Sequence, residues 1–422
     1  MNQPLPGADT ARLRILQVHN WYRSATPSGE NRVLERESAA LTGRGHEVIR
    51  FDRHSDDIER WPALRKAALP GQIVWSRSAR RELRARLRAA RPDVVHIHNT
   101  FPLLSPSVLY ACRDESVPVV ITVHNYRLLC AGGSFFRDGA ICRDCVSGHG
   151  IQAVRHGCYR DSRLATAPVA LSNALHMNAW RTLVSAYIFI SAAQRDLLAE
   201  LDLPPERVFV RHNLIPWRPV PQADREHSVL YAGRLDEAKG IRVLMAAWDQ
   251  YLADPGDAPL RLIIAGTGIL QGQVEAWAAS RPSVRLAGHV DDRQAADLMS
   301  RSRAVILPSI WAEPFGLVAV EAMAAGTPCI ASDHVALPEL ITNGVDGTLV
   351  PPGDPRALAA AIADVQARPD AYASYGQAAR ETYQKQFDPD QNVDQLLGIY
   401  RYAVAHAVGA RQAEVRQAEV RR

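Results

Sequence analysis

The chain has 422 residues, of which 47% are apolar and 22% are charged, a composition that excludes a disordered or fibrous protein. This length favours two domains over one. No stretch approaches the roughly 20 uninterrupted apolar residues of a membrane-spanning helix, and the N-terminus lacks the apolar core of a signal peptide, so we expect a soluble, cytoplasmic protein.

The net charge of +4 is unevenly distributed along the chain. Residues 1–220 hold 30 Lys and Arg against 20 Asp and Glu, whereas the remainder holds 19 against 25. The basic half is therefore either a solvated surface or one that faces an anionic partner, such as a phospholipid surface, a lipid diphosphate or an acidic glycan.

The first half of the sequence alternates short apolar runs with helical patterns. Strands are predicted at residues 13–19, 47–51, 93–98 and 117–124, and a helix at residues 31–42. Short apolar strands separated by helices indicate a parallel sheet covered on both faces. The Arg-rich residues 77–91 predict another helix, whose charges face either solvent or anionic lipid at the inner face of a membrane.

The same pattern begins again after a proline-rich segment at residues 216–221. Strands are predicted at residues 227–233, 260–266, 284–286, 304–307 and 328–331, and helices at residues 241–252 and from residue 389. We therefore predict two doubly wound α/β domains, residues 1–220 and 221–388, followed by a helix and a polar tail at residues 389–422. Ligands of such sheets bind beyond the carboxyl ends of the strands.

The most informative motif lies at residues 307–331, LPSIWAEPFGLVAVEAMAAGTPCIA. A tight turn at Gly316 leads from a strand into a helix, whose first N–H groups and dipole suit an anion such as a diphosphate. Glu313 precedes this helix and Glu321 lies about one turn inside it. Two carboxylates so placed can accept hydrogen bonds from separate sets of sugar hydroxyls.

A second motif, Gly-Arg-Leu-Asp-Glu-Ala-Lys-Gly at residues 233–240, directly follows a predicted strand. Arg234 can hold phosphate oxygens through its planar guanidinium, and Lys239 adds a compact charge. Two cations on one loop can neutralise a leaving nucleoside diphosphate without a catalytic metal.

Together these motifs resemble those of the retaining glycosyltransferase family 4: the stretch from Glu313 to Glu321 resembles the family's E-x7-E motif, and residues 233–240 resemble its diphosphate loop. Further similar segments are Arg-Gly-His-Glu-Val at residues 44–48, Thr-Val-His-Asn at 122–125, Ala-Gly-Thr-Gly at 265–268 and Gly-His-Val at 288–290. The resemblance covers residues 13–400 and implies a GT-B fold: two Rossmann-like domains facing each other across a cleft, with the last helix crossing back to the first domain.

The resemblance also implies roles for individual residues. Arg234 and Lys239 would bind the diphosphate of a nucleotide-sugar donor, Glu313 its sugar and Glu321 its ribose. His124 would lie near the anomeric carbon. The remaining donor contacts would come from residues beside the phosphates or the nucleotide: Gly29, Gly233, Gly266, Val290, Phe315, Gly316 and Leu317. At Gly29 the chain departs from the family, since Ser28 stands where a second glycine is common.

The acceptor is expected to be a glycan or a lipid-linked molecule, bound by the N-terminal domain, and no nucleic acid is expected. Asn99 and Arg127 are candidates for the acceptor side. His96 and His98, at the end of a predicted strand, are either structural residues or parts of the site. The family's usual route is a front-face reaction in which the leaving phosphate helps to deprotonate the acceptor hydroxyl.

Four of the six cysteines lie in residues 130–158, as Cys130, Cys142, Cys145 and Cys158. A C-x2-C pair with two further thiols has the ligand count of tetrahedral zinc, and a reducing cytosol disfavours disulfides. Structural zinc, an iron–sulfur cluster and thiols without a metal are the alternatives for this insertion.

Other functions compete with sugar transfer. A nucleotide-sugar epimerase fits poorly with the paired Glu313 and Glu321, and a phosphorylase would need a Schiff-base lysine from only three: Lys66, Lys239 and Lys385. A non-catalytic protein that binds a nucleotide sugar is the third alternative. The sequence favours transfer of a sugar in the synthesis of a bacterial surface polysaccharide or glycolipid.

Overall fold

The computed structural model describes residues 11–24, 28–147, 150–216, 225–256 and 258–420, with side chains as far as residue 407. The predicted domain boundary at residues 220–221 lies outside the described residues. Contacts divide the chain into two compact units. Unit 1 comprises Met1–Phe135, Arg143–Leu214 and Asp390–Arg422, and unit 2 comprises Phe136–Cys142 and Ile215–Pro389.

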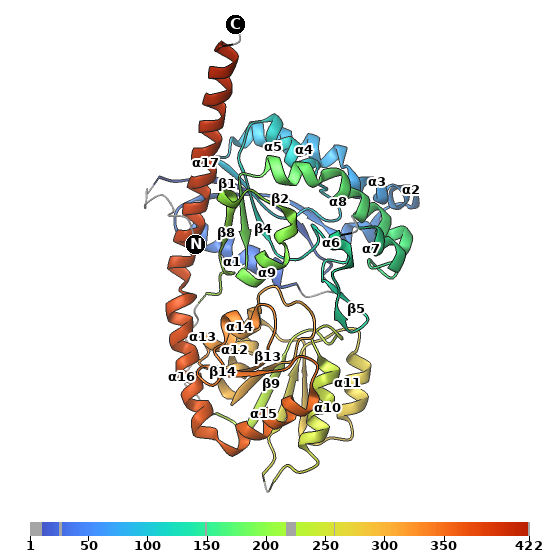
Figure 1. Cartoon of the computed structure of the whole chain (residues 1–422), viewed down its shortest axis with the longest axis vertical. Helices are drawn as coiled ribbons and strands as arrows, with labels where there is room; N and C mark the ends of the chain where they lie inside the picture. Colours follow the sequence, from blue (N-terminus) through green and yellow to red (C-terminus); the bar gives the residue numbers. More distant parts are fainter. Residues whose placement is uncertain (1–10, 25–27, 148–149, 217–224, 257, 421–422) are drawn as a thin grey trace. The chain divides into compact units, whose positions relative to one another are not determined.

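Unit 1 is built on a parallel six-stranded sheet in the order β2-β1-β3-β4-β7-β8 (Figure 1). Its strands are β1 (Arg14–Trp21), β2 (Glu47–His54), β3 (Val94–Asn99), β4 (Val119–Val123), β7 (Ala186–Phe189) and β8 (Val208–Val210). Its helices are α1 (Gly29–Gly43), α2 (Ala63–Ala67), α3 (Leu69–Val74), α4 (Arg77–Ala90), α5 (Ser107–Asp114), α6 (Asp144–Ser147), α7 (Ile151–His156), α8 (Arg163–Leu183), α9 (Ala192–Leu197) and α17 (Pro389–Val420).

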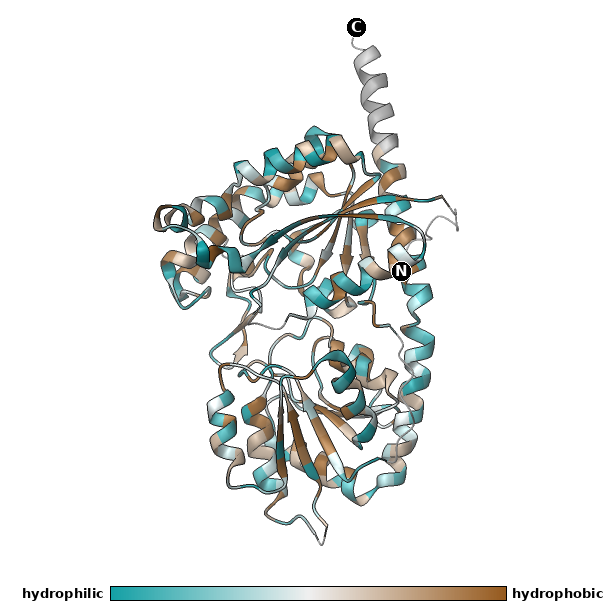
Figure 2. Cartoon of the chain, turned by 180° about the vertical axis from the view of Figure 1, so that it is seen from behind, coloured by the Kyte–Doolittle hydropathy of each residue, from teal (hydrophilic) through white to brown (hydrophobic). Residues whose placement is uncertain are grey.

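The inner strands β4 and β7 are buried and almost wholly apolar because helices cover both faces of the sheet, whereas β1 and β2 also carry polar side chains. Figure 2 colours each residue by its hydropathy. One core cluster joins Ile15, Val94 and Ile188 of the sheet to Leu396 and Tyr400 of α17. The last helix is therefore part of the core of unit 1.

The Arg-rich helix α4 is anchored to the end of α5 by ion pairs. Arg80 pairs with Asp114 at 2.5 Å, and Arg84 and Arg88 contact Glu115 at 2.8 and 2.9 Å. These three arginines thus stabilise the packing of two helices, although ion pairs this exposed contribute little each. None of the described helices combines the length and the low polarity needed to cross a bilayer.

Unit 2 has a second parallel sheet, in the order β11-β10-β9-β12-β13-β14. Its strands are β9 (Ser228–Ala232), β10 (Arg261–Ala265), β11 (Val284–Gly288), β12 (Ala304–Leu307), β13 (Cys329–Ser332) and β14 (Gly347–Val350), and a small hairpin pairs β5 (Phe136–Arg137) with β6 (Ala140–Ile141). Its helices are α10 (Ile241–Tyr251), α11 (Gln271–Ala278), α12 (Asp292–Arg301), α13 (Leu317–Ala324), α14 (Leu337–Leu340), α15 (Pro355–Ala367) and α16 (Pro369–Gln386).

The strand order decides where ligand-binding loops meet. In unit 2 the chain adds β10 and β11 on one side of β9 and then places β12 on the other side, so the order reverses between β9 and β12. Such a reversal is a topological switch point, beyond which ligands of open α/β sheets typically bind. Unit 1 has its reversal between β1 and β3.

The predicted strands all occur, with ends that differ by a few residues from the predicted ones. Strands β5, β6, β7, β8 and β14 were not predicted from the sequence. All five are at most four residues long, so they offer little periodic pattern. The equally short β12 and β13 were predicted because they flank the motif at residues 307–331.

Candidate functional site

The loop at residues 233–240 leaves β9 at the switch point of unit 2 and carries both predicted phosphate-binding cations. Asp236 organises it: one carboxylate oxygen accepts from Arg234 Nε at 2.7 Å, and the other accepts from the backbone N–H of Lys239 at 2.9 Å. Arg234 remains 40% exposed at its side chain. Its two terminal nitrogens make no bond with the residues that the structure describes, so they can take phosphate oxygens.

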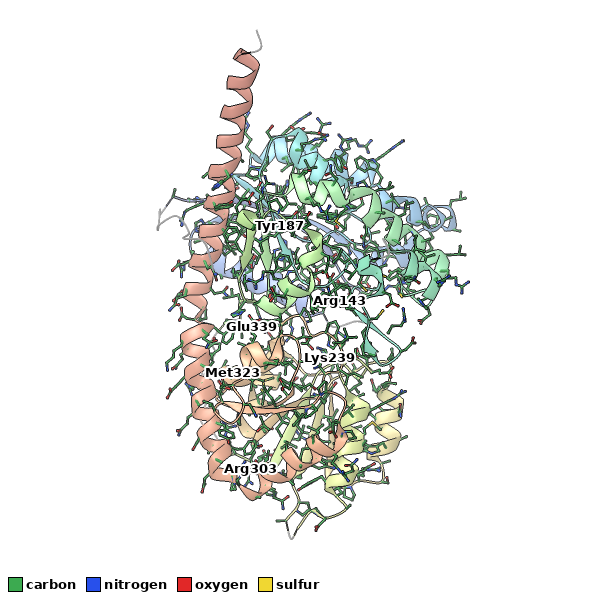
Figure 3. All side chains as sticks on the ribbon, viewed as in Figure 1. Arg143, Tyr187, Lys239, Arg303, Met323 and Glu339 are labelled. Atoms are coloured by element: carbon green, nitrogen blue, oxygen red, sulfur yellow. The ribbon has the colours of Figure 1, made fainter. Side chains whose placement is uncertain are left out.

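The two predicted motifs meet through an ion pair between Lys239 and Glu313. Lys239, labelled in Figure 3, places its Nζ 2.6 Å from Glu313 Oε2 and 5.1 Å from the centre of the Trp311 ring. The same carboxylate oxygen accepts from Trp311 Nε1 at 2.9 Å and from the Ser309 hydroxyl at 3.2 Å. The three donors hold Glu313 in one orientation.

Glu313 is ionised at neutral pH although it is only 7% exposed. Burial alone would raise the pKa of this carboxyl, but the charge and hydrogen bond of Lys239 and the Trp311 N–H lower it below the ordinary value of 4.5. A fixed, charged acceptor at this point suits ligand hydroxyl groups.

Helix α13 begins immediately after this carboxylate. Gly316 has a φ of +103°, and a Cβ there would lie 2.9 Å from Leu337, so the turn requires glycine. Leu317 then begins the helix, whose first N–H groups have no partner within the helix itself. The Phe315 side chain is buried against Phe387, so its backbone is the part left for a ligand. Glu321 lies half-buried one turn into α13.

Backbone packing brings the loops after β9 and β10 against each other. A Cβ on Gly266 would lie 1.8 Å from the carbonyl oxygen of Gly233, and the Gly266 N–H donates to the Gly288 carbonyl at 2.7 Å. Gly266 therefore leaves no room for a side chain where the two loops meet. Val290 lies two residues after the end of β11 and is half-buried.

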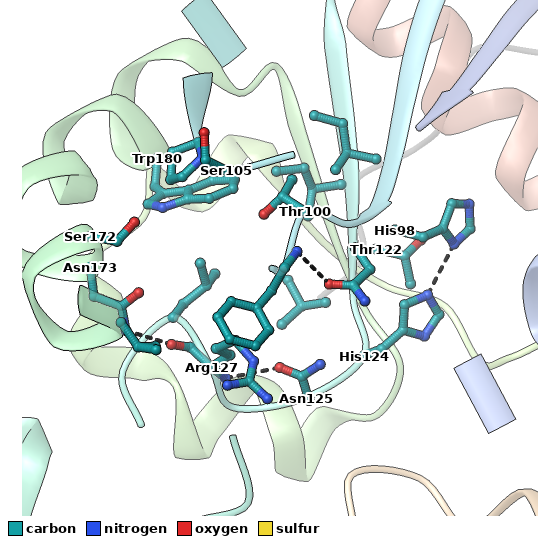
Figure 4. Close-up of a pocket in the computed structure, with 18 of the residues that line it drawn as sticks. His98, Thr100, Ser105, Thr122, His124, Asn125, Arg127, Ser172, Asn173 and Trp180 are labelled. Atoms are coloured by element: carbon teal, nitrogen blue, oxygen red, sulfur yellow. Dashed lines mark hydrogen bonds between the residues drawn. The ribbon is translucent and has the colours of Figure 1, made fainter. Parts of the chain in front are cut away.

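In unit 1, His124 follows β4 and lies beside His98 at the end of β3. Their rings stack with centroids 5.3 Å apart, and His124 Nε2 lies 3.0 Å from His98 Nδ1 (Figure 4). Burial is the main cause that lowers the pKa of His98 to about 3 and that of His124 well below 6.5. Both rings are therefore neutral at pH 7 and share one hydrogen bond.

A buried carboxylate, Glu37 of α1, stands behind these histidines. Its Oε1 lies 3.1 Å from His96 Nδ1 and 3.4 Å from His98 Nε2, and its Oε2 accepts from Arg211 at 2.8 Å. The pKa of Glu37 lies well below its ordinary value: burial opposes this, but Arg211 and the two histidines outweigh it.

Among the described residues, Glu37, His96 and His98 form the one group of three whose potential metal-ligand atoms lie within 4.8 Å of one another. Both ring nitrogens of His96 are already bonded, to the hydroxyls of Tyr400 and Thr122 at 2.7 and 2.8 Å. With Arg211 on the carboxylate as well, this group is better suited to positioning than to holding a metal.

Gly29 is the first residue of α1 and is followed by a buried carboxyl group, Glu30. Tyr22 donates its hydroxyl to Glu30 Oε2 at 3.2 Å. Burial raises the pKa of Glu30 to about 8, and Tyr22, Arg127 and Asn125 only partly offset this effect. Glu30 is thus mostly protonated at neutral pH.

The four cysteines of residues 130–158 differ in exposure. Cys130 and Cys145 are buried, and Cys142 and Cys158 are half-buried. Cys145 and Cys158 pack with Ala153 in a small apolar cluster of unit 1. Cys142 belongs to the segment assigned to unit 2, and the other three cysteines belong to unit 1. Structural zinc stays a prediction.

Three residues that position the predicted site residues were not predicted from the sequence: Glu37, Asp236 and Trp311. Glu37 had a usable signal, because it occupies a core position of α1 between Val33 and Leu41, at a spacing of four residues. A charged residue on the apolar face of a helix predicts a buried partner.

Two family models match this chain. Residues 27–216 match the model described as Glycosyltransferase Family 4, and residues 226–367 match the model described as Glycosyl transferases group 1.

Similar curated proteins match most of the chain or about a third of it. Glycogen synthase of Mycobacterium tuberculosis is 29% identical over 416 residues, which is 89% of this chain and 91% of that protein. Phosphatidyl-myo-inositol mannosyltransferase of Mycobacterium leprae is 40% identical over 137 residues, covering 32% of this chain and 36% of the relative.

Solved structures match along nearly the whole chain. Anabaena HepE in complex with UDP has a TM-score of 0.63 at 18% identity, covering 91% of this chain and 98% of its own. Sucrose-phosphate synthase from Thermosynechococcus elongatus has a TM-score of 0.66 at 20% identity, covering 94% of this chain and all of its own.

Proposed function

Since this chain is a glycosyltransferase with a GT-B fold, we propose that it is a retaining enzyme that transfers a sugar from a nucleoside-diphosphate donor. The acceptor is a glycan or a lipid-linked molecule in the synthesis of a bacterial surface polysaccharide or glycolipid. Solved neighbours with UDP support the donor class.

The observation that carries this proposal is the 2.6 Å contact between Lys239 and Glu313. It places a cation from the loop after β9 beside a carboxylate from the loop after β12. Arg234 and Lys239 would bind the diphosphate, with the first N–H groups of α13. Glu313, from the E-x7-E motif, would accept from the sugar hydroxyls and Glu321 from the ribose. A donor phosphate would then share Lys239 with Glu313.

The two cations and the helix start would stabilise the negative charge that develops on the leaving diphosphate, which is often the largest catalytic contribution of such a site. The leaving phosphate would accept the proton of the acceptor hydroxyl on the same face of the sugar. His124, which is neutral and held by His98, would contribute hydrogen bonding near the anomeric carbon.

We also propose roles for the Arg-rich helix α4 and for the four cysteines of residues 130–158. Arg77, Arg81 and Arg86 are exposed on α4, and they support peripheral contact with anionic lipid at the inner face of a membrane. The spacing of Cys130, Cys142, Cys145 and Cys158 supports structural zinc, which elemental analysis of the purified chain tests.

The test is transfer from a panel of UDP-, GDP- and ADP-sugars by the wild type and by Glu313→Gln. The amide keeps the shape but loses the charge, so we expect the turnover to fall by about 100-fold or more, as for other preorganised polar contacts. Glu275→Gln, at an exposed position of α11, is the matched control and should keep full activity.

Full activity of Glu313→Gln would contradict the site assignment. Tight binding of one donor without turnover on any acceptor would instead favour the second candidate, a non-catalytic nucleotide-sugar-binding protein. An epimerase would convert the donor sugar without an acceptor, which the same panel detects.

A further inference from the structure

A pocket of about 90 Å³ lies within unit 1, beside His124. Its walls come from the ends of β3 and β4, from the segments that follow them, and from α8. In Figure 4, His98 and His124 lie at one end and Ser172, Asn173 and Trp180 at the other. Hydroxyl and amide groups alternate with apolar side chains around the lining, a composition typical of sites for polar organic ligands.

Arg127 is the one lining residue that carries a charge at neutral pH, because the two lining histidines, His98 and His124, are neutral. Its guanidinium is held in place: Nη1 donates to the Ala131 carbonyl at 2.8 Å, and the group stacks on the Phe101 ring at 4.3 Å. A cation fixed in this way is ready to bind a ligand without further ordering.

The backbone beneath Arg127 is fixed as well. Its N–H donates to Asn125 Oδ1 at 3.0 Å, and its carbonyl accepts from Asn173 Nδ2 at 2.6 Å. Asn125 and Asn173 both belong to the pocket lining. The position of the guanidinium is therefore set by the pocket itself rather than by a mobile surface loop.

This cation has no counter-charge in the part of the chain that the structure describes. Its Nε is buried and has no hydrogen-bond partner, and no described carboxylate forms an ion pair with Arg127. The acidic group that interacts with it, Glu30, is mostly protonated at neutral pH because burial raises its pKa to about 8. A half-buried charge without a partner carries a desolvation cost that an anionic ligand would offset.

We propose that this pocket binds the acceptor through an anionic group of the acceptor, a phosphate or a carboxylate, with Arg127 as its counter-ion. The proposal rests on the proposed function and deepens it, since it assigns a chemical class to the acceptor. The planar guanidinium can donate to two oxygens of one such group. An uncharged acceptor would leave Arg127 as it is now, half-buried and without a counter-charge.

The experiment measures, by calorimetry on the full chain, the binding of two pairs of probes in which one member carries an anionic group and the other does not. Geranyl phosphate is compared with geraniol, and a glucuronate-terminated disaccharide with its glucose-terminated counterpart. We expect one charged probe to bind at least about tenfold more tightly than its neutral partner, as for a hydrogen bond to a charged group. The pair that shows the advantage distinguishes a lipid phosphate from an acidic glycan.

Arg127→Gln should remove this charge advantage, whereas Arg155→Gln, an exposed change on α7 of the same unit, should retain it. The proposal is overturned if the wild type binds the charged and the neutral probe of both pairs equally, or binds neither. It is also overturned if Arg127→Gln still binds a charged probe more tightly than its neutral partner. The wild-type comparison decides the question even if the variant does not fold.

UDP binding is measured separately on the same samples. If the wild-type chain does not bind UDP, the result argues against the proposed donor site. The comparison between charged and neutral probes remains valid in that case. Unchanged UDP binding in Arg127→Gln is expected, because Arg127 belongs to unit 1, whereas Arg234, Lys239 and Glu321, which would bind the diphosphate and the ribose, belong to unit 2.

Discussion

Glu30 and Glu313 are both buried carboxyl groups, yet their surroundings give them opposite charge states. Glu313 faces Lys239 at 2.6 Å, which lowers its pKa, whereas Glu30 receives mainly a tyrosine hydroxyl, and burial raises its pKa to about 8. A full opposing charge within hydrogen-bond distance outweighs burial, and a neutral donor does not.

The protonated state of Glu30 predicts a pH-dependent stability. The folded chain keeps this proton up to about pH 8, while the unfolded chain releases it near the ordinary pKa of 4.5. Between these values the folded state binds more protons, so this group's contribution to stability falls as the pH rises and becomes constant above about pH 8.

We expect Glu30→Gln, which keeps the neutral shape, to remove that fall. The Tm of the variant relative to the wild type should therefore rise from pH 5 to pH 9, as measured by thermal unfolding across this range. A constant difference in Tm at every pH would show that Glu30 is ionised in the folded protein.

At the scale of elements, the position of the candidate site follows from strand order. Residues 233–240 and 308–316 are about 70 positions apart in sequence, and they meet because β9 and β12 are neighbours at the reversal of the sheet. The motifs predicted which residues matter and that they follow strands. The contact between Lys239 and Glu313 could not be predicted directly, because it depends on the pairing of distant strands.

Local sequence patterns predicted some elements of this fold and missed others. Long amphipathic helices and strands that flank a recognisable motif were predictable, whereas β7 and β14, which are short and flank no such motif, were not. The network of Glu37 and Arg211 was missed because each residue's partner lies 174 positions away. Local patterns indicate that a buried charge needs a partner, and only the fold supplies it.

Close packing of the loop at residues 233–240 predicts a strong effect of one added methyl group. Gly240 has a φ of +70°, and a Cβ there would lie 1.7 Å from the Pro308 carbonyl oxygen, so Gly240→Ala must displace one of the two site loops. We expect UDP affinity to fall by about tenfold or more, measured by calorimetry, because Lys239 and Glu313 would separate.

Gly272→Ala is the matched control, since a Cβ at Gly272 of α11 would meet no heavy atom within 4 Å. This change lies in a helix, where alanine is favoured over glycine, so it should preserve or slightly raise stability. Unchanged UDP affinity in Gly240→Ala would mean that the spacing of the two loops does not matter for the donor.

For the whole molecule, the comparisons confirm the GT-B fold, and each of the two units has its own apolar core. The core of unit 1 is completed by residues from the far end of the chain, since Leu396, Ile399 and Tyr400 of α17 are fully buried in it. Unit 1 therefore cannot finish folding until α17 is available, whereas the core of unit 2 is formed by residues 229–372.

This arrangement predicts separable effects of core mutations. Leu396→Ala removes a fully buried side chain of α17, which typically costs about 2–5 kcal/mol of stability. In hydrogen exchange we expect faster exchange of the amides of β1, β3 and β4, with β9 and β12 unchanged. Ile362→Ala, in the core of unit 2, should give the reverse pattern. Equal acceleration in both sheets by either variant would mean that the two cores unfold as one cooperative unit, and that α17 stabilises the whole chain rather than the sheet on which it packs.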